Sequence, residues 1–246
     1  MGGLTSEVQS GMRRLMVFLA LYLGGRPGSA QPAGPGPQAG PLVRWPEALG
    51  FVALTSITFA TDRSIRTTMQ GHNSGFRNSV ADFGNAFGNS RYVFPALFLV
   101  AVGAKMGGSS DLYEGSWRSL KSTVLASTTT LVLKSAFGRR RPDVTPHDPY
   151  RFNPVSFTFN SFPSGHTTVA FSLATSLAME SKSHLDDVVL YGLAASTAFA
   201  RVHVDKHWAS DTVVGAAIGI LAARFVRRHD RSSRPQATLV AWSVTF

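Results

Sequence analysis

The chain of 246 residues contains no cysteine, which excludes disulfide scaffolds, thiol nucleophiles and metal sites built on cysteine. Acidic residues are also scarce, with 14 Asp and Glu against 24 Lys and Arg, so the formal net charge is +10. Such a balance favours anionic partners such as phosphate esters, lipid headgroups or nucleic acid. Internal repeats and the dinucleotide-binding glycine pattern are absent too.

Long uninterrupted hydrophobic runs are missing from most of the chain, although 44% of the residues are hydrophobic. What is present is a series of apolar segments rich in Ala, Leu and Val, separated by Gly, Pro, Asn or charged residues, which is typical of helices. We expect an all-α fold, a helical bundle of about six helices. The predicted helices cover 47–60, 92–107, 117–137, 166–181, 187–202 and 210–228.

Membrane association stays open at this point. Most of the apolar runs are shorter than the roughly 20 residues that cross a bilayer as a helix, which favours a bundle that buries its apolar faces internally. The segments 93–104 and 213–226 could nevertheless lie in or against a bilayer.

The N-terminus has the pattern of an export signal. Arg13 and Arg14 precede the apolar run 15–23, and Gly28-Ser29-Ala30 offers small residues for cleavage. We therefore predict a signal peptide at residues 1–30. An uncleaved anchor is the alternative, but the apolar run is short for a membrane span.

Two further segments complete the predicted organisation. Residues 31–46 are rich in Pro and Gly and are interpreted as a linker, because this composition buries too little apolar surface to fold alone. One domain then occupies 47–246. In its tail, 238–246, large apolar residues alternate with smaller ones. This period of two predicts a short C-terminal β-strand.

The first cluster of chemically notable residues lies where a predicted helix ends at Gly138 and Pro142. It contains Lys134 and the run Arg139–Arg141. Taken alone, such a run is more often a basic helix end that complements the helix dipole or faces acidic lipid.

The second cluster is Pro163-Ser164-Gly165-His166, a turn that leads directly into an apolar helix. A helix N-terminus presents free N–H groups, and a serine hydroxyl and a glycine beside them suit an anionic oxygen. A protonated His166 could donate to a leaving group. The alternative is that Ser164 merely caps the helix.

The third cluster, at the junction of two predicted helices, contains Arg201, His207 and Asp211. A spacing of four lets the Asp211 carboxylate accept from one imidazole nitrogen of His207, which leaves the other nitrogen free to attack. Asp211 could also be only a helix cap. His203 and Asp205, between them, are assigned to a solvated surface and not to metal binding.

Together the three clusters supply what phosphoryl transfer to a side chain requires, namely cations, N–H donors, a nucleophile, an orienting carboxylate and a proton donor. Their spacing resembles the signature of the type 2 phosphatidic acid phosphatase superfamily, which is related to bacterial non-specific acid phosphatases and vanadium haloperoxidases. Lys134 with Arg141-Pro142, then Pro163-Ser164-Gly165-His166, then Arg201 with His207 and Asp211 match it in order. Ala200 departs from the signature, which usually has serine there.

The resemblance, which covers roughly 117–228, implies the roles of these residues in a metal-independent phosphatase without a cofactor. His207 would become phosphorylated, Asp211 would orient it, and His166 would protonate the leaving alkoxide and later activate water. The groups implied to bind the phosphoryl oxygens are Lys134, Arg141, Ser164, the N–H of Gly165, and Arg201.

The expected substrate is a phosphate monoester, with a lean toward lipid or isoprenoid phosphates over small soluble ones. Nucleic acid is not expected as a partner. The export signal implies a periplasmic or membrane-associated enzyme with its site outside the cytoplasm. The aromatic residues of the 143–162 connection, Phe152, Phe157, Phe159 and Phe162, could line a lipid-accepting mouth, but packing is the simpler explanation.

Three other functions remain open from the residues. A soluble periplasmic non-specific acid phosphatase would use the same site. A vanadium-dependent haloperoxidase would hold vanadate in an equivalent pocket, although such enzymes are generally longer. A non-enzymatic protein could bind anionic lipid through patches at 139–141 and 224–231, but this would leave the order of the two histidines and the aspartate unexplained.

Overall fold

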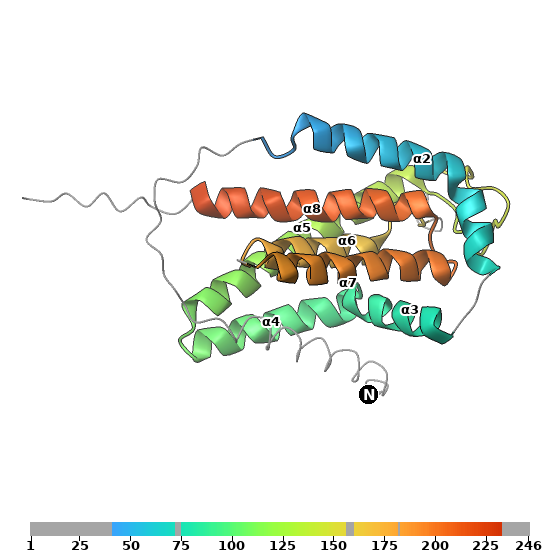
Figure 1. Cartoon of the computed structure of the whole chain (residues 1–246). Coiled ribbons are helices and arrows are strands. Elements are labelled where there is room, and N and C mark those ends of the chain that lie inside the picture. Colours follow the sequence, from blue (N-terminus) through green and yellow to red (C-terminus); the bar gives the residue numbers. More distant parts are fainter. Residues whose placement is uncertain (1–40, 72–74, 156–159, 182, 233–246) are drawn as a thin grey trace, which may run out of the picture.

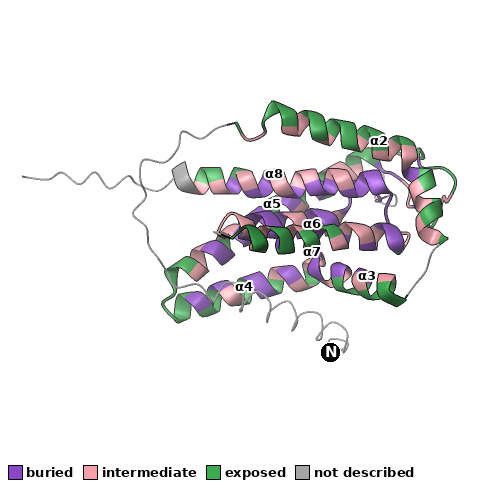
Figure 2. Cartoon of the chain, viewed as in Figure 1, coloured by how far each residue is buried: buried purple, intermediate pink, exposed green. Residues whose placement is uncertain are grey.

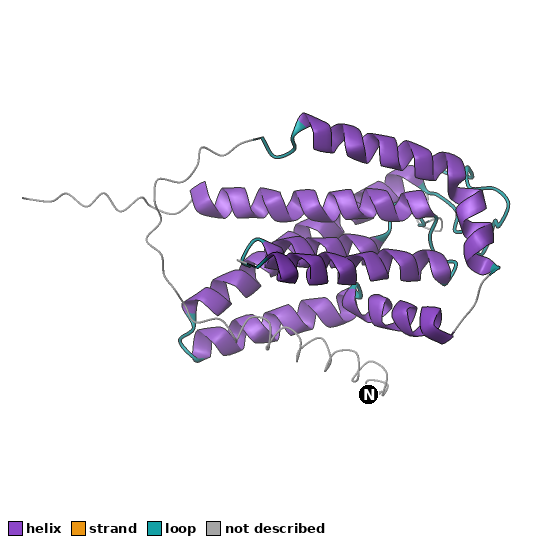
Figure 3. Ribbon diagram, viewed as in Figure 1, coloured by secondary structure: helices purple, strands orange, loops and turns teal. Residues whose placement is uncertain are grey.

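The structure is a computed structural model that describes residues 41–71, 75–155, 160–181 and 183–232 (Figure 1). Figure 3 shows helices joined by loops throughout this part of the chain. The predicted all-α fold is confirmed, and the described residues hold one isolated β-bridge, between Arg139 and Phe152. The helices are α2 (Trp45–Gln70), α3 (Gly75–Phe87), α4 (Ser90–Met106), α5 (Ser110–Phe137), α6 (Gly165–Ala178), α7 (His184–His203) and α8 (Ala209–Ser232).

Helix α6 is the centre of the bundle. It contacts α5, α7 and α8, and its residues 167–170 and 172–177 are all buried (Figure 2). Its apolar residues Val169, Leu173 and Leu177 pack with α4 and α7 in the main hydrophobic core. Its small hydroxyl residues face the helices that pass closest, and Thr168, for example, is within 3.0 Å of the Thr130 hydroxyl of α5.

Two glycines of α8 allow the close crossing between α6 and α8. A Cβ added at Gly219 would lie 2.5 Å from the carbonyl oxygen of Thr168, and one at Gly215 would lie 2.6 Å from that of Ser164. Both contacts are with backbone atoms, which cannot move aside cheaply. The two helix axes are thus held together, and the start of α6 stays beside the start of α8.

Several helices carry large apolar residues on their exposed outer surfaces, which Figure 2 shows in green. Helix α2 exposes Trp45, Leu49, Val52 and Ile57, each more than half accessible. Other exposed large apolar residues lie on α4, α5 and α7 and include Phe98, Met106, Leu131, Val132, Leu185 and Val188. Exposed apolar surface this extensive marks an interaction with a membrane or another apolar partner.

Among the described residues, one helix is long and apolar enough to cross a membrane, at Ala209–Asp230 in α8. Half of this apolar stretch is buried inside the bundle. Core helices of soluble proteins satisfy the same criterion. The two segments singled out earlier are each only partly exposed. In 93–104, for example, Val93 and Leu97 are fully buried whereas Phe98 and Leu99 are exposed.

Each of the six predicted helices corresponds to a helix of the structure, whereas α3 was not predicted. Its apolar residues Phe76, Val80, Phe83 and Phe87 recur at helical spacing, but the segment is short and contains glycines and several polar residues, so it lacks the long run rich in Ala, Leu and Val that marks the other helices. Helix α2 continues to Gln70, ten residues beyond its predicted end, and begins at Trp45, inside the predicted linker. The predicted signal peptide at 1–30 and C-terminal strand at 238–246 lie outside the described residues.

The α6–α8 crossing gives a stability test. Gly219→Ala should destabilise the folded protein by about 1–3 kcal/mol, because the new methyl group overlaps backbone atoms of α6. The control is Gly192→Ala, in the interior of α7, where an added Cβ meets nothing within 4 Å. It should stabilise the helix by roughly 0.5–1 kcal/mol. Urea unfolding of the purified proteins measures both; equal effects of the two substitutions would contradict the close crossing.

Candidate active site

The three sequence clusters meet at one end of the bundle, where α5 ends, α6 begins and α7 passes into α8. The N–H of Ser164 donates to the carbonyl oxygen of Asp211 over 2.9 Å, which joins the starts of α6 and α8. A Cβ added at Gly165 would lie 3.8 Å from Cε of Lys134, so α5 reaches the same place. All the residues predicted for the site from the three clusters are therefore brought to one region.

His207 lies in the turn between α7 and α8, which is closed by the carbonyl oxygen of Arg201 accepting from the N–H groups of Lys206 and His207. The imidazole is 3% exposed. Its Nδ1 lies 3.5 Å from Oδ2 of Asp211, longer than an ordinary hydrogen bond. This nitrogen has no other hydrogen-bond partner among the described residues. The arrangement directs Nδ1 toward the carboxylate, and catalytic hydrogen bonds often tighten only when substrate binds.

Electrostatics keep His207 neutral. Burial lowers the pKa of its imidazole to about 4; Asp211 acts in the opposite direction, and Lys134 and Arg201 add to the lowering. For Asp211, burial raises the pKa, but the interaction with His207 and the charge of Arg139 outweigh it, so the net pKa is lowered. At neutral pH the site thus holds an uncharged imidazole beside an ionised carboxylate.

Three cations lie in the region of this imidazole, and none of them forms an ion pair with a carboxylate in the described part of the chain. Among the described residues, the side chains of Lys134, Arg141 and Arg201 donate to amide and carbonyl oxygens and not to a carboxylate. Burial lowers the pKa of Lys134 to about 8, partly offset by Asp211, and the other two cations lower it further. Burial and then Arg141 lower the pKa of Arg201 to about 10. Such mutual repulsion in a buried place favours binding of an anion.

Neutral groups hold these cations in position. Lys134 donates to the carbonyl oxygen of Asn160 over 2.5 Å, and Arg141 donates to the side-chain oxygen of the same residue over 2.9 Å. Arg201 donates to the side-chain oxygen of Asn85, on α3, over 2.9 Å. Because amide oxygens carry no net charge, they orient the cations and leave their positive charge available.

The start of α6 faces the same region. Ser164 is the N-cap residue, but its side chain makes no capping bond, so the capping interpretation of its hydroxyl is wrong. Instead Ser164 is fully buried and its oxygen is 3.0 Å from the Thr167 hydroxyl. Unpaired N–H groups of the first turn, together with this hydroxyl, suit the oxygens of an anion.

His166 occupies the first turn of α6. Burial lowers the pKa of its imidazole to about 3, and the positive charges of Arg201, Lys134 and Arg141 lower it further. These interactions place His166 close to the other site residues and keep it neutral while no anion is bound.

Several polar residues of this region were not identified from the sequence. Asn85 and Asn160 hold the cations, while Asp62 of α2 and Ser161 and Ser210 join Asp211 in a buried network. Asp62 lies just beyond the predicted end of the first helix, at residue 60, where nothing in the local sequence indicated that it would be buried and require a partner.

Two sequence interpretations are wrong in detail. Arg139 is not part of a surface patch, because it is completely buried. His203 is not solvated either: it is 7% exposed, its Nε2 lies 2.9 Å from the side-chain oxygen of Asn78, and its ring stacks on Phe199. Asp205 is half-buried and pairs with Arg66 over 2.6 Å.

Of the four phenylalanines in the 143–162 connection, two lie among the described residues, and both pack against other groups. Phe152 lies under the Arg139 guanidinium and near Phe59, and Phe162 packs edge-on against Phe137. Phe157 and Phe159 lie outside the described residues. In the part of the chain that the structure describes, no group of three or more His, Cys, Asp or Glu side chains is placed to hold a metal ion.

Comparison with known proteins identifies the domain. Residues 115–233 match the PAP2 superfamily. The lipid A 1-phosphatase of Porphyromonas gingivalis is 29% identical over 184 residues, which cover 71% of this chain but only 36% of that protein. The chain thus spans about a third of the length of this relative.

Solved structures resemble the bundle as well. The transmembrane PAP2-type phosphatidylglycerolphosphate phosphatase from Bacillus subtilis superimposes with a TM-score of 0.60 at 20% identity, over 77% of this chain and 96% of that one. Aquifex aeolicus LpxE gives a TM-score of 0.49 at 20% identity, over 67% and 93%. Residues 115–233 of this chain are therefore a PAP2 superfamily domain, with the all-α fold found in the first of these structures.

The protonation of His207 can be measured directly. Because its pKa is lowered to about 4, the ring should stay neutral on acidification from pH 8 to pH 5, whereas an unperturbed histidine titrates near about 6.5. NMR of ring-labelled histidine follows this, with His207→Asn to assign the signal. A titration midpoint near the unperturbed value would contradict the buried, cation-flanked environment described above.

Proposed function

We propose that this protein is a phosphatase that hydrolyses a lipid phosphate monoester through a phosphohistidine formed on His207. The observation that carries the proposal is the neutral, buried imidazole of His207, which faces Asp211 on one side and is flanked by Lys134 and Arg201, with Arg141 beside them. A phosphate group completes this arrangement, because it supplies the missing negative charge and a phosphorus atom to attack.

In the first half-reaction, Nε2 of His207 attacks phosphorus and the bond from phosphorus to the ester oxygen breaks. His166 gives its proton to the departing alkoxide. Asp211 accepts the proton on Nδ1 of His207 in a hydrogen bond and so stabilises the positive charge that develops on the ring. Lys134, Arg141 and Arg201, with Ser164 and the N–H of Gly165, bind the phosphoryl oxygens.

In the second half-reaction, the now neutral His166 takes a proton from water, and the water oxygen attacks phosphorus. The phosphorus–nitrogen bond breaks, which releases inorganic phosphate and restores His207. His166 needs a proton at the start of the next cycle, although its pKa in the empty site is about 3. A bound phosphate monoester carries up to two negative charges and raises that pKa, so the proton is held when substrate is present.

The apolar exterior supports a lipid as the substrate. Large apolar residues are exposed on α2, α4, α5 and α7, a surface suited to contact with acyl chains or a membrane. The relative with the matching sequence is a lipid A 1-phosphatase, and that enzyme acts on a phosphorylated lipid. A polyprenyl or glycerolipid phosphate would present its phosphate to the site while its chains remain in the apolar phase.

The location of the protein follows from its N-terminal pattern. Residues 1–30 would act as a signal peptide and 31–46 as a linker, with the phosphatase domain at 47–246 placed at a membrane surface outside the cytoplasm. The net charge of +10 would favour anionic membrane surfaces.

The function is tested by measuring phosphate release with a metal chelator present, from phosphatidate in mixed micelles and from a small aryl phosphate. Wild-type protein should release phosphate from both, with a higher kcat/KM for phosphatidate, because its acyl chains can contact the apolar exterior. His207→Ala should reduce release to the level of the uncatalysed control, since the nucleophile is gone.

His184→Ala is the matched control, because His184 is fully exposed at the start of α7, away from the site. It should keep wild-type rates. Release that persists in His207→Ala would exclude the phosphohistidine route, and a preference for the aryl phosphate would favour a non-specific acid phosphatase. Absence of hydrolysis, with bromide oxidation on addition of vanadate, would indicate a haloperoxidase.

A further inference from the structure

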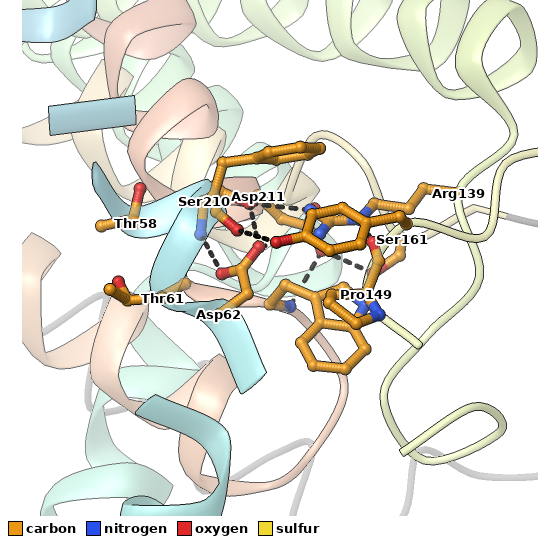
Figure 4. A network of polar contacts seen from close by, with 12 residues as sticks. Thr58, Thr61, Asp62, Arg139, Pro149, Ser161, Ser210 and Asp211 are labelled. Carbon is orange, nitrogen blue, oxygen red and sulfur yellow. Dashed lines mark hydrogen bonds and ion pairs between the residues drawn. The ribbon is translucent and has the colours of Figure 1, made fainter. Parts of the chain in front are cut away.

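Arg139 lies two residues before Arg141, one of the cations proposed to bind the phosphate, but it has a different environment. Its guanidinium is fully buried. Figure 4 shows it between two carboxylates: it donates to Oδ1 of Asp211 over 2.6 Å and to Oδ2 of Asp62 over 2.7 Å. It also donates to the hydroxyl of Ser210 over 2.7 Å and to the carbonyl oxygen of Pro149 over 2.8 Å.

Aromatic rings enclose the same guanidinium. Its carbon lies 5.0 Å from the ring centre of Phe59, 5.4 Å from that of Phe152 and 5.5 Å from that of Trp208. These rings separate the network from water and limit the directions in which Arg139 can move. A charge buried in this way persists only where its partners are held in place.

Asp62 is ionised in this network. Its two oxygens accept three kinds of donor: the Ser210 N–H at 2.9 Å, the Ser210 hydroxyl at 2.6 Å and the Arg139 guanidinium. Because the Ser210 hydroxyl accepts from Arg139, its own proton points to Asp62. Burial outweighs the bonds from Ser210 and the charge of Arg139, so the net pKa of Asp62 is raised; the donors on both of its oxygens are what favour the ionised form.

The network determines which oxygen Asp211 presents to His207. Arg139 occupies Oδ1 of Asp211. The other oxygen, Oδ2, accepts from the Ser161 hydroxyl at 2.5 Å and the Trp208 N–H at 2.9 Å, and lies 3.5 Å from Nδ1 of His207. With bonds on both oxygens, the plane of the carboxylate is fixed and Oδ2 stays directed at the imidazole.

The charges of the network have a second consequence. Arg139 and Asp211 alone would form a neutral pair, which would weaken the attraction of Asp211 for a positively charged imidazole. Asp62 shares the Arg139 charge, so the three groups together carry one net negative charge. That charge remains available to the ring of His207 when the ring becomes cationic on phosphorylation.

We propose that Asp62 and Arg139 are positioning residues for phosphoryl transfer, which hold Asp211 in the orientation and with the charge that direct the Nδ1 proton of His207 toward it. This inference rests on the proposed function. It also extends the site to α2, because Asp62 precedes residues 115–233, which match the PAP2 superfamily. The leading helix therefore acts in the chemistry of the domain and does not only cover the bundle.

Asp62→Asn tests this, because it removes the charge with little change in shape. The control is Asp230→Asn, which removes a carboxylate paired with Lys121 at the far end of α8. With phosphatidate in mixed micelles, Asp62→Asn should lower kcat by about 10- to 100-fold, the loss usual when a partner that orients a site residue is removed. KM should change little, since the phosphate is bound by other residues. The control should retain the wild-type kcat.

A readout independent of turnover separates this inference from the proposed function. The ¹⁵N chemical shifts of the His207 ring at neutral pH report which nitrogen carries the proton. Wild type and Asp230→Asn should show the proton on Nδ1, and Asp62→Asn should show a mixture of both tautomers. A folded Asp62→Asn with the wild-type tautomer and kcat would overturn the inference, whereas an inactive wild type with the expected tautomers would overturn only the proposed function.

Asp62→Asn leaves a buried arginine with one partner fewer and could fail to fold. The second variant is therefore Asp62→Leu with Arg139→Met, which replaces the ion pair by apolar groups, an exchange that proteins often tolerate. It leaves Asp211 without its Oδ1 partner. A fall in kcat at an unchanged KM, with mixed tautomers of His207, would support the inference; wild-type values for both would overturn it.

Discussion

The ion pair between Arg139 and Asp211, both completely buried, is the interaction on which the active-site end of the bundle depends. It joins the loop after α5 to the start of α8, and through Asp62 it includes α2 as well (Figure 4). Removing one member would leave a charge without a partner in an apolar enclosure, which typically costs about 3–5 kcal/mol. The network therefore constrains the loop, both helices and the orientation of Asp211 together.

In the same region, two arginines that lie close together in sequence have different partners and therefore different roles. Arg139 is bonded by two carboxylates, whereas Arg141, two residues later, is bonded by the amide oxygen of Asn160. The first arginine consequently holds the surroundings of His207 in place, and the second retains its charge for an anion. The close crossing of α6 and α8 then brings the N-terminus of α6 and its free N–H groups to the same place.

The sequence was sufficient for the parts of the site that depend on local spacing. The four-residue interval between His207 and Asp211 and the turn before His166 define geometry within one segment, so their juxtaposition could be predicted. Asp62, Asn85 and the separate role of Arg139 could not, because their partners lie far along the chain and depend on how helices pack. Helix α3 was missed for a related reason: Gly84, which allows the close contact with α7, interrupts the short apolar pattern of this helix.

The central claim, that His207 becomes phosphorylated, is tested most directly by trapping the intermediate. His166→Ala removes the group proposed both to protonate the leaving alkoxide and to activate water. With an aryl phosphate, whose phenolate leaves readily without a proton donor, the second half-reaction should be the slower one, so brief incubation should leave a phosphoryl group on the protein. We expect peptide mass spectrometry to place an acid-labile phosphoryl group on His207, and none on His207→Ala. A phosphoryl group on another residue, or turnover by wild type without any phosphorylated protein, would contradict the account.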